Sequence, residues 1–252
     1  MDSESLMSAQ WSLVTGASRG IGRAVVELLL ARGRSVIACA RESEQLRELA
    51  QNERVAVLPC DLAQPGAAQE LIERATALGP LRELVLAAGV AQHAAFANVG
   101  ERALRAQLEL NFFAPFFLIQ HAAARMERGA IVAIGSTLAF RAAPTTSAYA
   151  ASKAALLSLV RGAALELAPR IRVNALAPGV VDTAMIRAPR RDPEPGEDPV
   201  SVIAEQLEAL RALHPLGRLG TPEEVADAVL YLLEAPWLTG SVLTLDGGLT
   251  LS

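Results

Sequence analysis

The sequence has little of several residue types on which particular classes of protein depend. Only 4% of its 252 residues are aromatic, although 52% are hydrophobic. This composition favours helices and buried strands over an aromatic-rich β-sandwich, and it argues against intrinsic disorder. There are two cysteines, Cys39 and Cys60, which are too few for a disulfide framework and lack the spacing of metal ligands. We therefore expect two buried, reduced thiols.

Long apolar runs and runs of one charge are also absent. No uninterrupted stretch of about 18 apolar residues occurs. The richest stretch, Phe112 to Ala124, contains Pro115, Gln120 and His121. The 23 basic residues stand against 27 acidic residues, so the net charge is −4 and no basic run forms. We expect neither nucleic acid nor a membrane as a partner.

The N-terminus and the histidines exclude two further classes. Asp2 and Glu4 stand where a secretory signal peptide carries positive charge. The histidines, His93, His121 and His214, form no closely spaced pair, so no metal site is predicted. These observations lead us to expect a cytoplasmic enzyme or binding protein.

Short aliphatic runs alternate with helical patterns along the whole chain. The runs are apolar throughout, which is typical of strands that are buried on both faces of a parallel sheet. Seven strands are predicted: Ser12–Thr15, Ser35–Ala40, Val55–Pro59, Leu84–Ala87, Ala130–Ile134, Ile171–Ala177 and Ser241–Leu245. The alternation predicts an α/β fold with a doubly wound sheet and helices on both faces.

Two helix boundaries and one irregular segment carry clear signals. Gly33 is expected to end a helix over Ile21 to Arg32, and Thr221 is expected to cap a helix that begins at Pro222. The segment from Arg187 to Pro199 has four prolines and seven charged residues, which predicts an exposed, mobile excursion. It is interpreted either as an active-site lid or as a tolerated surface insertion.

A glycine cluster follows the first predicted strand and begins the first helix. The stretch Thr15 to Gly22 reads TGASRGIG, with the spacing GxxxGxG. Glycines here allow a tight turn and let the backbone approach a pyrophosphate, which would lie at the helix N-terminus. The cluster predicts a dinucleotide site, although tight strand–helix turns also use glycine for steric reasons alone.

The ends of the next two strands suggest which dinucleotide is bound. Arg41 follows the second strand and Arg19 lies in the glycine loop, and arginines suit the 2′-phosphate of NADP(H). Glu42 would favour NAD(H) if the strand ended later, and Arg41 could be a solvated residue at a helix start. Asp61 and Leu62 follow the third strand, where they would bind adenine unless Asp61 caps the next helix.

The most specific constellation combines Ser136, Tyr149 and Lys153. Tyr149 and Lys153 are four residues apart and so lie on one face of a helix. A free tyrosine has a pKa of about 10, and a neighbouring ammonium is expected to lower it toward the range of acid–base catalysis. Ser136 ends the fifth strand, where its hydroxyl could hold a substrate carbonyl oxygen.

With these motifs the chain resembles a classical short-chain dehydrogenase/reductase. The resemblance runs from Thr15 to the Leu245-Asp246-Gly247-Gly248 stretch, and so implies a single Rossmann domain over residues 1–252, with a tail (1–9) and a substrate-side excursion (183–215). It implies that Tyr149 is the general acid/base, Ser136 orients the carbonyl, Lys153 lowers the Tyr149 pKa and binds the nicotinamide ribose, and Asn111 holds a relay water. The cofactor-binding residues that it implies are Gly16, Ser18, Arg19, Gly20, Ile21, Gly22, Arg41, Asp61, Leu62, Ala88, Gly89, Tyr149, Lys153, Pro178, Gly179, Val181 and Thr183.

One motif departs from the pattern of the family. The asparagine pair expected after the fourth strand is replaced by Leu86 and Ala87, before Ala88 and Gly89. The small residues remain, but the asparagine hydrogen bonds are lost. This departure bears on local rigidity and cofactor affinity more than on the acid–base residues.

The expected reaction is hydride transfer between NADP(H) and a ketone or secondary alcohol. His93, Leu138 and Met185 are candidate substrate contacts, although a loop histidine without a role is the favoured interpretation of His93. The stretch from His214 to Glu224 resembles 3-oxoacyl-carrier-protein reductases, whose carrier protein docks on arginines. Arg170 matches one docking position, but Glu127 occupies the other. A general carbonyl reductase is therefore an equal alternative.

Two further expectations concern partners. A catalytically weak NADP(H) sensor or scaffold is the alternative to an enzyme, supported only by the missing asparagines. Four of the six phenylalanines, Phe112, Phe113, Phe116 and Phe117, gather in one predicted helix. They indicate a homodimer or homotetramer, unless both faces of that helix are buried within one chain.

Overall fold

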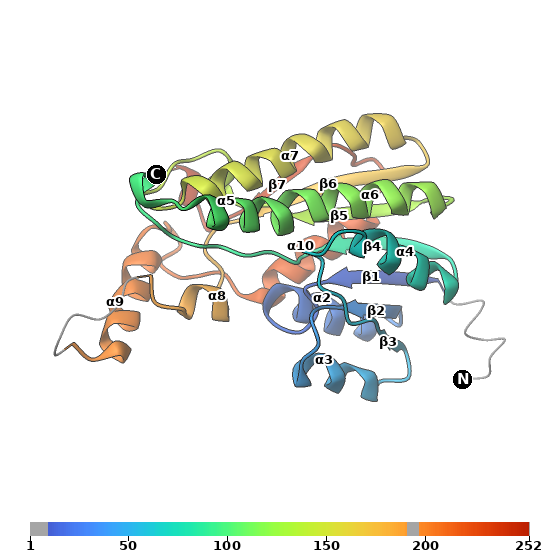
Figure 1. Cartoon of the computed structure of the whole chain (residues 1–252), viewed down its shortest axis with the longest axis horizontal. Coiled ribbons are helices and arrows are strands. Elements are labelled where there is room, and N and C mark those ends of the chain that lie inside the picture. Colours follow the sequence, from blue (N-terminus) through green and yellow to red (C-terminus); the bar gives the residue numbers. More distant parts are fainter. Residues whose placement is uncertain (1–9, 191–196, 252) are drawn as a thin grey trace.

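One parallel sheet forms the centre of the molecule (Figure 1). The computed structural model describes residues 10–190 and 197–251, so the predicted tail over residues 1–9 lies outside the described residues. The sheet order is β3-β2-β1-β4-β5-β6-β7, and all neighbouring strands are parallel. The strands are β1 (Trp11–Thr15), β2 (Ser35–Cys39), β3 (Val55–Val57), β4 (Leu81–Leu86), β5 (Gly129–Ile134), β6 (Ile171–Pro178) and β7 (Val242–Leu245). The predicted seven-stranded Rossmann fold is confirmed.

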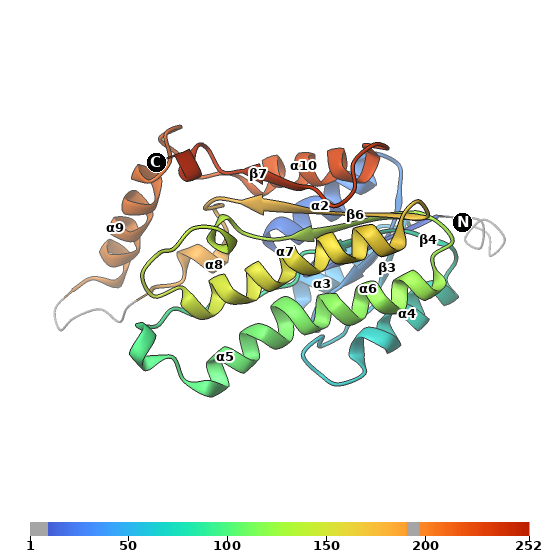
Figure 2. The same ribbon diagram turned by 90° about the horizontal axis from the view of Figure 1, so that it is seen from above.

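Helices cover both faces of this sheet (Figures 1 and 2). One face carries α4 (Ala67–Ala77), α5 (Glu101–Leu108), α6 (Ala114–Arg125) and α7 (Ser147–Leu167). The other carries α2 (Gly20–Ala31), α3 (Glu44–Glu48) and α10 (Pro222–Glu234). Two further helices, α8 (Ala184–Arg187) and α9 (Pro199–Ala212), lie beyond the carboxyl ends of the strands.

Alternating side chains of each strand feed two separate cores. Leu13 and Ile37 belong to the core under α4, α6 and α7. Their strand neighbours Val14 and Val36 belong to the core under α2 and α10. Because both faces of the strands are covered by helices, apolar residues are needed at every position, which explains the continuous apolar runs in the sequence.

Several strand boundaries differ from the predictions for a physical reason. β4 begins at Leu81, three residues before the predicted start at Leu84, because charged residues at its beginning hide the strand. The partly buried Glu83 carboxylate forms an ion pair with Arg34 and accepts a hydrogen bond from the Ser12 hydroxyl at 2.6 Å. β2 ends one residue early, at Cys39, and β3 covers only Val55–Val57.

The predicted helix that carries the phenylalanines is not a regular α-helix. Residues Glu109–Phe113 form a single π-helical turn, and α6 follows it. The Ala114 amide donates to the Glu109 carbonyl, and Pro115 has no amide hydrogen to donate to the carbonyl of Asn111. The local sequence therefore removes the usual helical donor to the Asn111 carbonyl.

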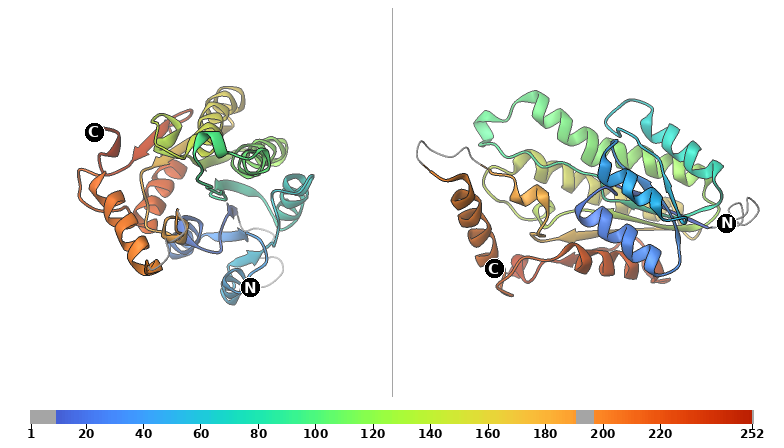
Figure 3. Two further views of the ribbon diagram at one scale, coloured as in Figure 1. Left: turned by 60° about the vertical axis from the view of Figure 1, so that its left-hand side comes forward. Right: turned by 90° about the horizontal axis from the view of Figure 1, so that it is seen from below.

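The segment Arg187 to Pro199 is described only at its ends, and residues 191–196 lie outside the described residues. The described ends are exposed, as predicted. α9 begins at Pro199, where the Asp198 side chain accepts from the Val200 amide at 3.2 Å. The right view of Figure 3 shows α9 (orange-brown) beyond the end of the layered body.

A capping box begins α10, as the sequence predicted for Thr221. The Thr221 hydroxyl accepts from the Glu224 amide at 3.2 Å, and the Glu224 carboxylate accepts from the Thr221 amide at 2.9 Å. Arg218 donates twice to the same carboxylate, and this pairing lowers the pKa of Glu224 to about 2. The box fixes the start of the helix that packs against α2.

We expect Thr221→Ala to lower the free energy of unfolding by about 1 kcal/mol, because one amide at the start of α10 loses its acceptor. Urea denaturation followed by circular dichroism measures this change. Ser158→Ala is the matched control, since Ser158 is exposed in the middle of α7 and alanine favours a helix there. An equal loss of stability in both variants would contradict the role of the box.

Candidate functional site

The glycine loop lies directly against the neighbouring strand end. A Cβ on Gly16 would come within 2.9 Å of the backbone of Ala87 and Ala88, and Gly16 has a φ of 68°. A Cβ on Gly22 would lie 2.2 Å from the Gly16 carbonyl oxygen. Gly20, with a φ of 57°, would contact Thr183 at 3.3 Å. These positions allow only glycine, so the loop is compressed between β1, β4 and the segment after β6.

The hydroxyl of Thr15 holds the segment that lacks the asparagine pair. It accepts from the amides of Ala87 and Ala88 at 3.1 and 3.2 Å, and it donates to the Val85 carbonyl at 3.3 Å. Thr15 is fully buried between β1 and β4. These hydrogen bonds hold the segment that lacks the asparagine pair. The role of Thr15 was not predicted, although a polar residue at the end of a buried strand was the available signal.

The start of α2 fits a pyrophosphate. Arg19 precedes the helix in an extended conformation, and no side chain caps the first amides. Ser18 and Ile21 are partly exposed beside Gly20. An uncapped helix N-terminus on a glycine loop presents free amides and the positive end of the helix dipole.

The strand end beside this loop carries positive charge. Arg41 and Arg19 are both exposed. Glu42, which would oppose a 2′-phosphate, is paired at 2.5 Å with Arg47 in the last turn of α3. β2 ends before Ala40, so the condition under which Glu42 would favour NAD(H) is not met.

Asp61 and Leu62 have local structural partners. The Asp61 carboxylate accepts from the Ala63 amide at 3.2 Å and from the Gln64 side chain at 3.1 Å. It therefore shapes a turn and does not cap α4, whose cap position is Gly66. Leu62 is buried in the core.

The predicted catalytic residues converge at the carboxyl edge of β4 and β5. Lys153 is buried, and its Nζ donates to the Ile134 carbonyl at 2.8 Å. A Cβ on Gly89 would lie 3.5 Å from this Nζ and 3.2 Å from Asn111 Oδ1. Burial lowers the pKa of Lys153 to about 8.

Tyr149 lies beside Ser136 in the same cluster. Burial raises the pKa of Tyr149 to about 12, and the interaction with the Ser136 hydroxyl opposes this shift. The Lys153 Nζ is 5.8 Å from the centroid of the Tyr149 ring and bonds to Ile134 instead. The predicted lowering of the Tyr149 pKa by Lys153 is therefore wrong for this structure, because burial sets the direction of the shift and only the Ser136 hydroxyl opposes it.

Asn111 is fully buried and its side chain is fully engaged. Its Nδ2 donates to the Val90 carbonyl at 2.8 Å and to the Ser152 hydroxyl at 3.0 Å, and its Oδ1 accepts from the Val90 amide at 2.9 Å. Ser152 in turn donates to the Tyr149 carbonyl at 2.7 Å. Ser152 was missed in the sequence, although it lies within the Tyr149–Lys153 motif.

The segment after β6 forms the opposite wall. Gly179 packs on Asp246, where a Cβ would come within 2.9 Å, and Val181 forms a bridge to Gly220. Pro178 and Val181 are buried and Thr183 is partly exposed. Val181 and Thr183 therefore stand close to the glycine loop, as the contact of Thr183 with Gly20 shows.

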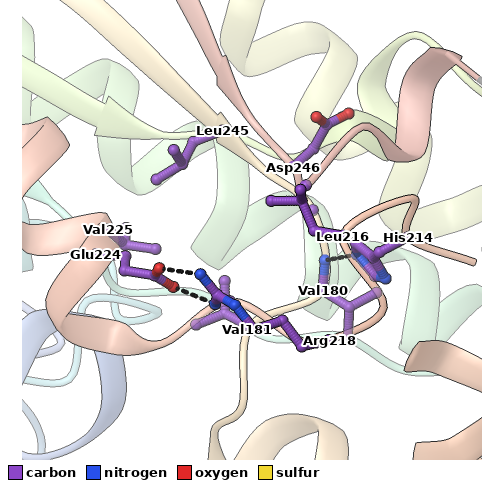
Figure 4. A pocket seen from close by; sticks show the side chains of 12 residues that line it. Val180, Val181, His214, Leu216, Arg218, Glu224, Val225, Leu245 and Asp246 are labelled. Atoms are coloured by element: carbon purple, nitrogen blue, oxygen red, sulfur yellow. Dashed lines mark hydrogen bonds and ion pairs between the residues drawn. The ribbon is translucent and has the colours of Figure 1, made fainter. Parts of the chain in front are cut away.

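His214 supports this wall from behind (Figure 4). Its Nε2 accepts from the Val180 amide at 3.2 Å, so the Nδ1 hydrogen donates to the Leu210 carbonyl at 2.9 Å. A cavity of about 70 Å³ lies between His214, Val181 and the Arg218–Glu224 pair. It includes none of Ser136, Tyr149 and Lys153, so it is a packing space behind the candidate site.

The three candidate substrate residues differ in how far their side chains are exposed to solvent. Leu138 is partly exposed after Ser136, whose Oγ accepts from the Leu138 amide at 3.1 Å. Met185 is exposed on α8. His93 is half-buried, and its Nδ1 has no partner among the residues that the structure describes.

Arg170 and Arg172 donate hydrogen bonds to helix C-termini at the opposite edge of the sheet. Arg170 donates to the carbonyls of Ala123 and Met126 at the end of α6. Arg172 donates to carbonyls at the end of α10, including that of Leu232 at 3.0 Å. The docking position matched by Arg170 is thus occupied by a helix-capping side chain.

Two absences hold for residues 10–190 and 197–251. No helix in these ranges is long and apolar enough to span a membrane. Within the same ranges, no cluster of three or more His, Cys, Asp or Glu side chains could hold a metal ion.

Comparisons with known proteins agree with this geometry. The family model described as enoyl-(acyl carrier protein) reductase matches residues 16–250. The chain is 36% identical over 247 residues to carbonyl reductase family member 4 of Danio rerio, covering 95% of this chain and 98% of the relative. It is 35% identical over 247 residues to 3-oxoacyl-[acyl-carrier-protein] reductase of Bos taurus, covering 95% and 97%.

A solved structure supports the same assignment. The crystal structure of a blue fluorescent protein from a metagenomic library, in complex with NADPH, superposes with a TM-score of 0.82 at 32% identity, covering 97% of this chain and 99% of that one. This chain is thus similar to these proteins over nearly its whole length, in addition to having the parallel sheet, the glycine loop and the Ser–Tyr–Lys cluster. The chain belongs to the short-chain dehydrogenase/reductase family of oxidoreductases.

Proposed function

We propose that the protein is an NADP(H)-dependent ketoreductase in which Tyr149 is the general acid/base. The observation that carries this proposal is the convergence of Ser136, Tyr149, Lys153 and Asn111 beside Gly89 at the carboxyl edge of the sheet. This edge is where ligands bind in doubly wound sheets. Gly16, Gly20 and Gly22, the uncapped start of α2 and the wall formed by Val181 and Thr183 fit a dinucleotide.

The residues suit the protonation of a carbonyl oxygen. When bound, the nicotinamide supplies the hydride. The Ser136 and Tyr149 hydroxyls donate hydrogen bonds to the carbonyl oxygen, and Tyr149 transfers its proton as negative charge develops there. With a pKa of about 12, Tyr149 is protonated at neutral pH, which is the state required for reduction.

Lys153 and Asn111 support the proton transfer. The Lys153 ammonium donates to the Ile134 carbonyl beside Gly89, and it is the group that would bind the nicotinamide ribose. The side chain of Asn111 is engaged, so its main-chain carbonyl is the group that would hold a water. Pro115 has no amide hydrogen, so the usual helical donor to that carbonyl is missing.

Three observations support NADP(H) over NAD(H). Arg19 and Arg41 are exposed beside the glycine loop, and Glu42 is paired with Arg47. The blue fluorescent protein of similar fold was solved in complex with NADPH. Asp61, Leu62, Ala88 and Gly89 would line the adenosine side, as the family pattern implies.

The relatives suggest two substrate classes. Their names indicate carbonyl reduction and 3-oxoacyl-carrier-protein reduction. Arg170 is engaged in capping α6, and Glu127 is exposed next to Arg128, so this surface favours a carrier protein less than a free ketone. The Thr15 hydroxyl holds the segment that lacks the asparagine pair, which favours an enzyme over the sensor or scaffold alternative.

The chain is also proposed to form a homo-oligomer through α6. Phe113, Phe116 and Phe117 are 42%, 38% and 43% exposed, while the opposite side of α6 is buried. The alternative that both faces are buried within one chain does not hold. The cytoplasmic location stays a prediction.

We expect Tyr149→Phe to lower the rate of NADPH-dependent ketone reduction by about 10²- to 10⁴-fold, because the proton donor is removed. NADPH oxidation measured at 340 nm over a panel of ketones tests this. The matched control is Tyr231→Phe, since Tyr231 is exposed on α10 far from Ser136. An unchanged rate of ketone reduction in Tyr149→Phe would contradict the proposed mechanism. NADPH binding by the wild type without reduction of any ketone would favour a sensor.

Arg41→Asp is expected to shift the ratio of kcat/KM for NADPH over NADH by about 10- to 100-fold toward NADH, because a charge-assisted contact with the 2′-phosphate is replaced by repulsion. Steady-state kinetics with both cofactors measure the ratio. Arg102→Asp, an exposed change of the same charge on α5, is the control. No shift in the ratio would refute the 2′-phosphate assignment.

Phe117→Glu is expected to reduce the mass in solution to that of a monomer, because a charge is placed in the proposed apolar contact. Light scattering coupled to size exclusion measures the mass. Phe96→Glu serves as the control, since Phe96 is 84% exposed in another segment. An oligomer that persists in Phe117→Glu, or a wild type that is already monomeric, would contradict the proposed interface.

A further inference from the structure

Ser152 is a fully buried polar residue of α7 to which the proposed mechanism gives no role. Its hydroxyl donates to the Tyr149 carbonyl at 2.7 Å and accepts from the Asn111 Nδ2 at 3.0 Å. A bond from a serine to a carbonyl of the preceding turn is common in helices. The bond from Asn111 is different, because Asn111 lies 41 residues earlier in the chain. Ser152 therefore links two separate parts of the candidate site.

The Asn111 side chain uses all of its hydrogen-bonding hydrogens in this link. Its Oδ1 accepts from the Val90 amide at 2.9 Å, and its Nδ2 donates to the Val90 carbonyl at 2.8 Å as well as to Ser152. A carboxamide has two N–H hydrogens, so both are engaged. Because Asn111 is fully buried, removal of the Ser152 oxygen would leave one of these hydrogens without its acceptor, which destabilises this position of the side chain.

The two neighbours of the Ser152 hydroxyl require a group that both donates and accepts. The Tyr149 carbonyl can only accept, and the Asn111 Nδ2 can only donate. A hydroxyl has one hydrogen to donate and lone pairs to accept, so it satisfies both neighbours at once. Alanine at this position would satisfy neither neighbour, whereas threonine would keep the hydroxyl.

These hydrogen bonds join three segments around the proposed proton donor. Val90 follows β4, Asn111 lies in the π-helical turn before α6, and Ser152 lies on α7. The same three segments pack closely, since a Cβ on Gly89 would lie 3.2 Å from Asn111 Oδ1 and 3.5 Å from Lys153 Nζ. The position of Asn111 relative to α7 is therefore fixed by the hydrogen bond to Ser152 as well as by packing.

We propose that Ser152 is a positioning residue for proton transfer, because through Asn111 it sets the spacing between the Asn111 main-chain carbonyl and Tyr149. That carbonyl is the group that would hold the relay water, and Tyr149 is the proposed proton donor. Ser152 is fully buried, so it acts through Asn111 and not on the substrate or the cofactor directly. This inference rests on the proposed ketoreductase function, because it assigns a further residue to the same reaction.

Ser152→Ala should lower kcat by about 10-fold for the ketone that the wild type reduces fastest, and change KM for NADPH and for the ketone by less than about twofold. The solvent isotope effect on kcat, measured in H₂O and D₂O, should rise, because proton transfer limits the rate more. Partial unfolding would lower kcat but leave this isotope effect unchanged. Ser152→Thr should restore kcat to within about threefold of the wild type, because it keeps the hydroxyl. Ser158→Ala, the same change as Ser152→Ala at an exposed position of α7, should alter neither kcat nor the isotope effect.

Amide hydrogen exchange separates this proposal from the proposed function, because it requires no turnover. The Val90 amide donates to Asn111, so its exchange should be faster by about 10-fold in Ser152→Ala and unchanged in Ser158→Ala. This result supports the positioning of Asn111 by Ser152 even if no ketone is reduced, in which case only the ketoreductase proposal fails. Unchanged exchange of the Val90 amide in Ser152→Ala, an isotope effect equal to that of the wild type, or an effect confined to KM would overturn the role of Ser152.

Discussion

The site depends on the close approach of two backbones where the winding of the sheet reverses. β1 pairs with β2 on one side and with β4 on the other, so the connections leave in opposite directions. The Gly16 loop then lies against Ala87 and Ala88 with no room for a Cβ. The Thr15 hydroxyl fixes this contact by accepting from two amides of the β4 side. Every other wall of the site is built outward from this junction.

Burial of the candidate catalytic cluster lowers the stability of the charged forms of its side chains. Lys153 and Tyr149 are both shifted toward their neutral forms, because burial penalises charge on either side chain. The neighbouring polar groups limit this cost: Ile134 accepts from Lys153, and Asn111, Ser152 and the Tyr149 carbonyl form one chain of hydrogen bonds. The cluster is therefore rigid, and its groups are positioned before any substrate arrives.

The sequence predicted the sheet well, because buried parallel strands leave a continuous apolar signal. The start of β4 was predicted three residues too late, because this strand begins with charged residues. The charge of Glu83 is compensated by an ion pair with Arg34, which is far away in the chain. The catalytic residues could be named from their spacing. The role of Thr15 and the direction of the Tyr149 pKa could not, because both depend on which elements become neighbours and on how much water they exclude.

Desolvation also distinguishes the positions of arginine and lysine in this chain. Lys153 is the only lysine in the chain, and the other 22 basic residues are arginines. Arginine keeps its charge and its fork of donors at partly buried places, as Arg170 and Arg172 do on the carbonyls that end α6 and α10. The pKa of a lysine shifts more readily on burial, and burial lowers the Lys153 pKa to about 8 beside Tyr149. The compact ammonium of Lys153 donates to the Ile134 carbonyl in this buried cluster, where the larger, planar guanidinium of an arginine would not be equivalent.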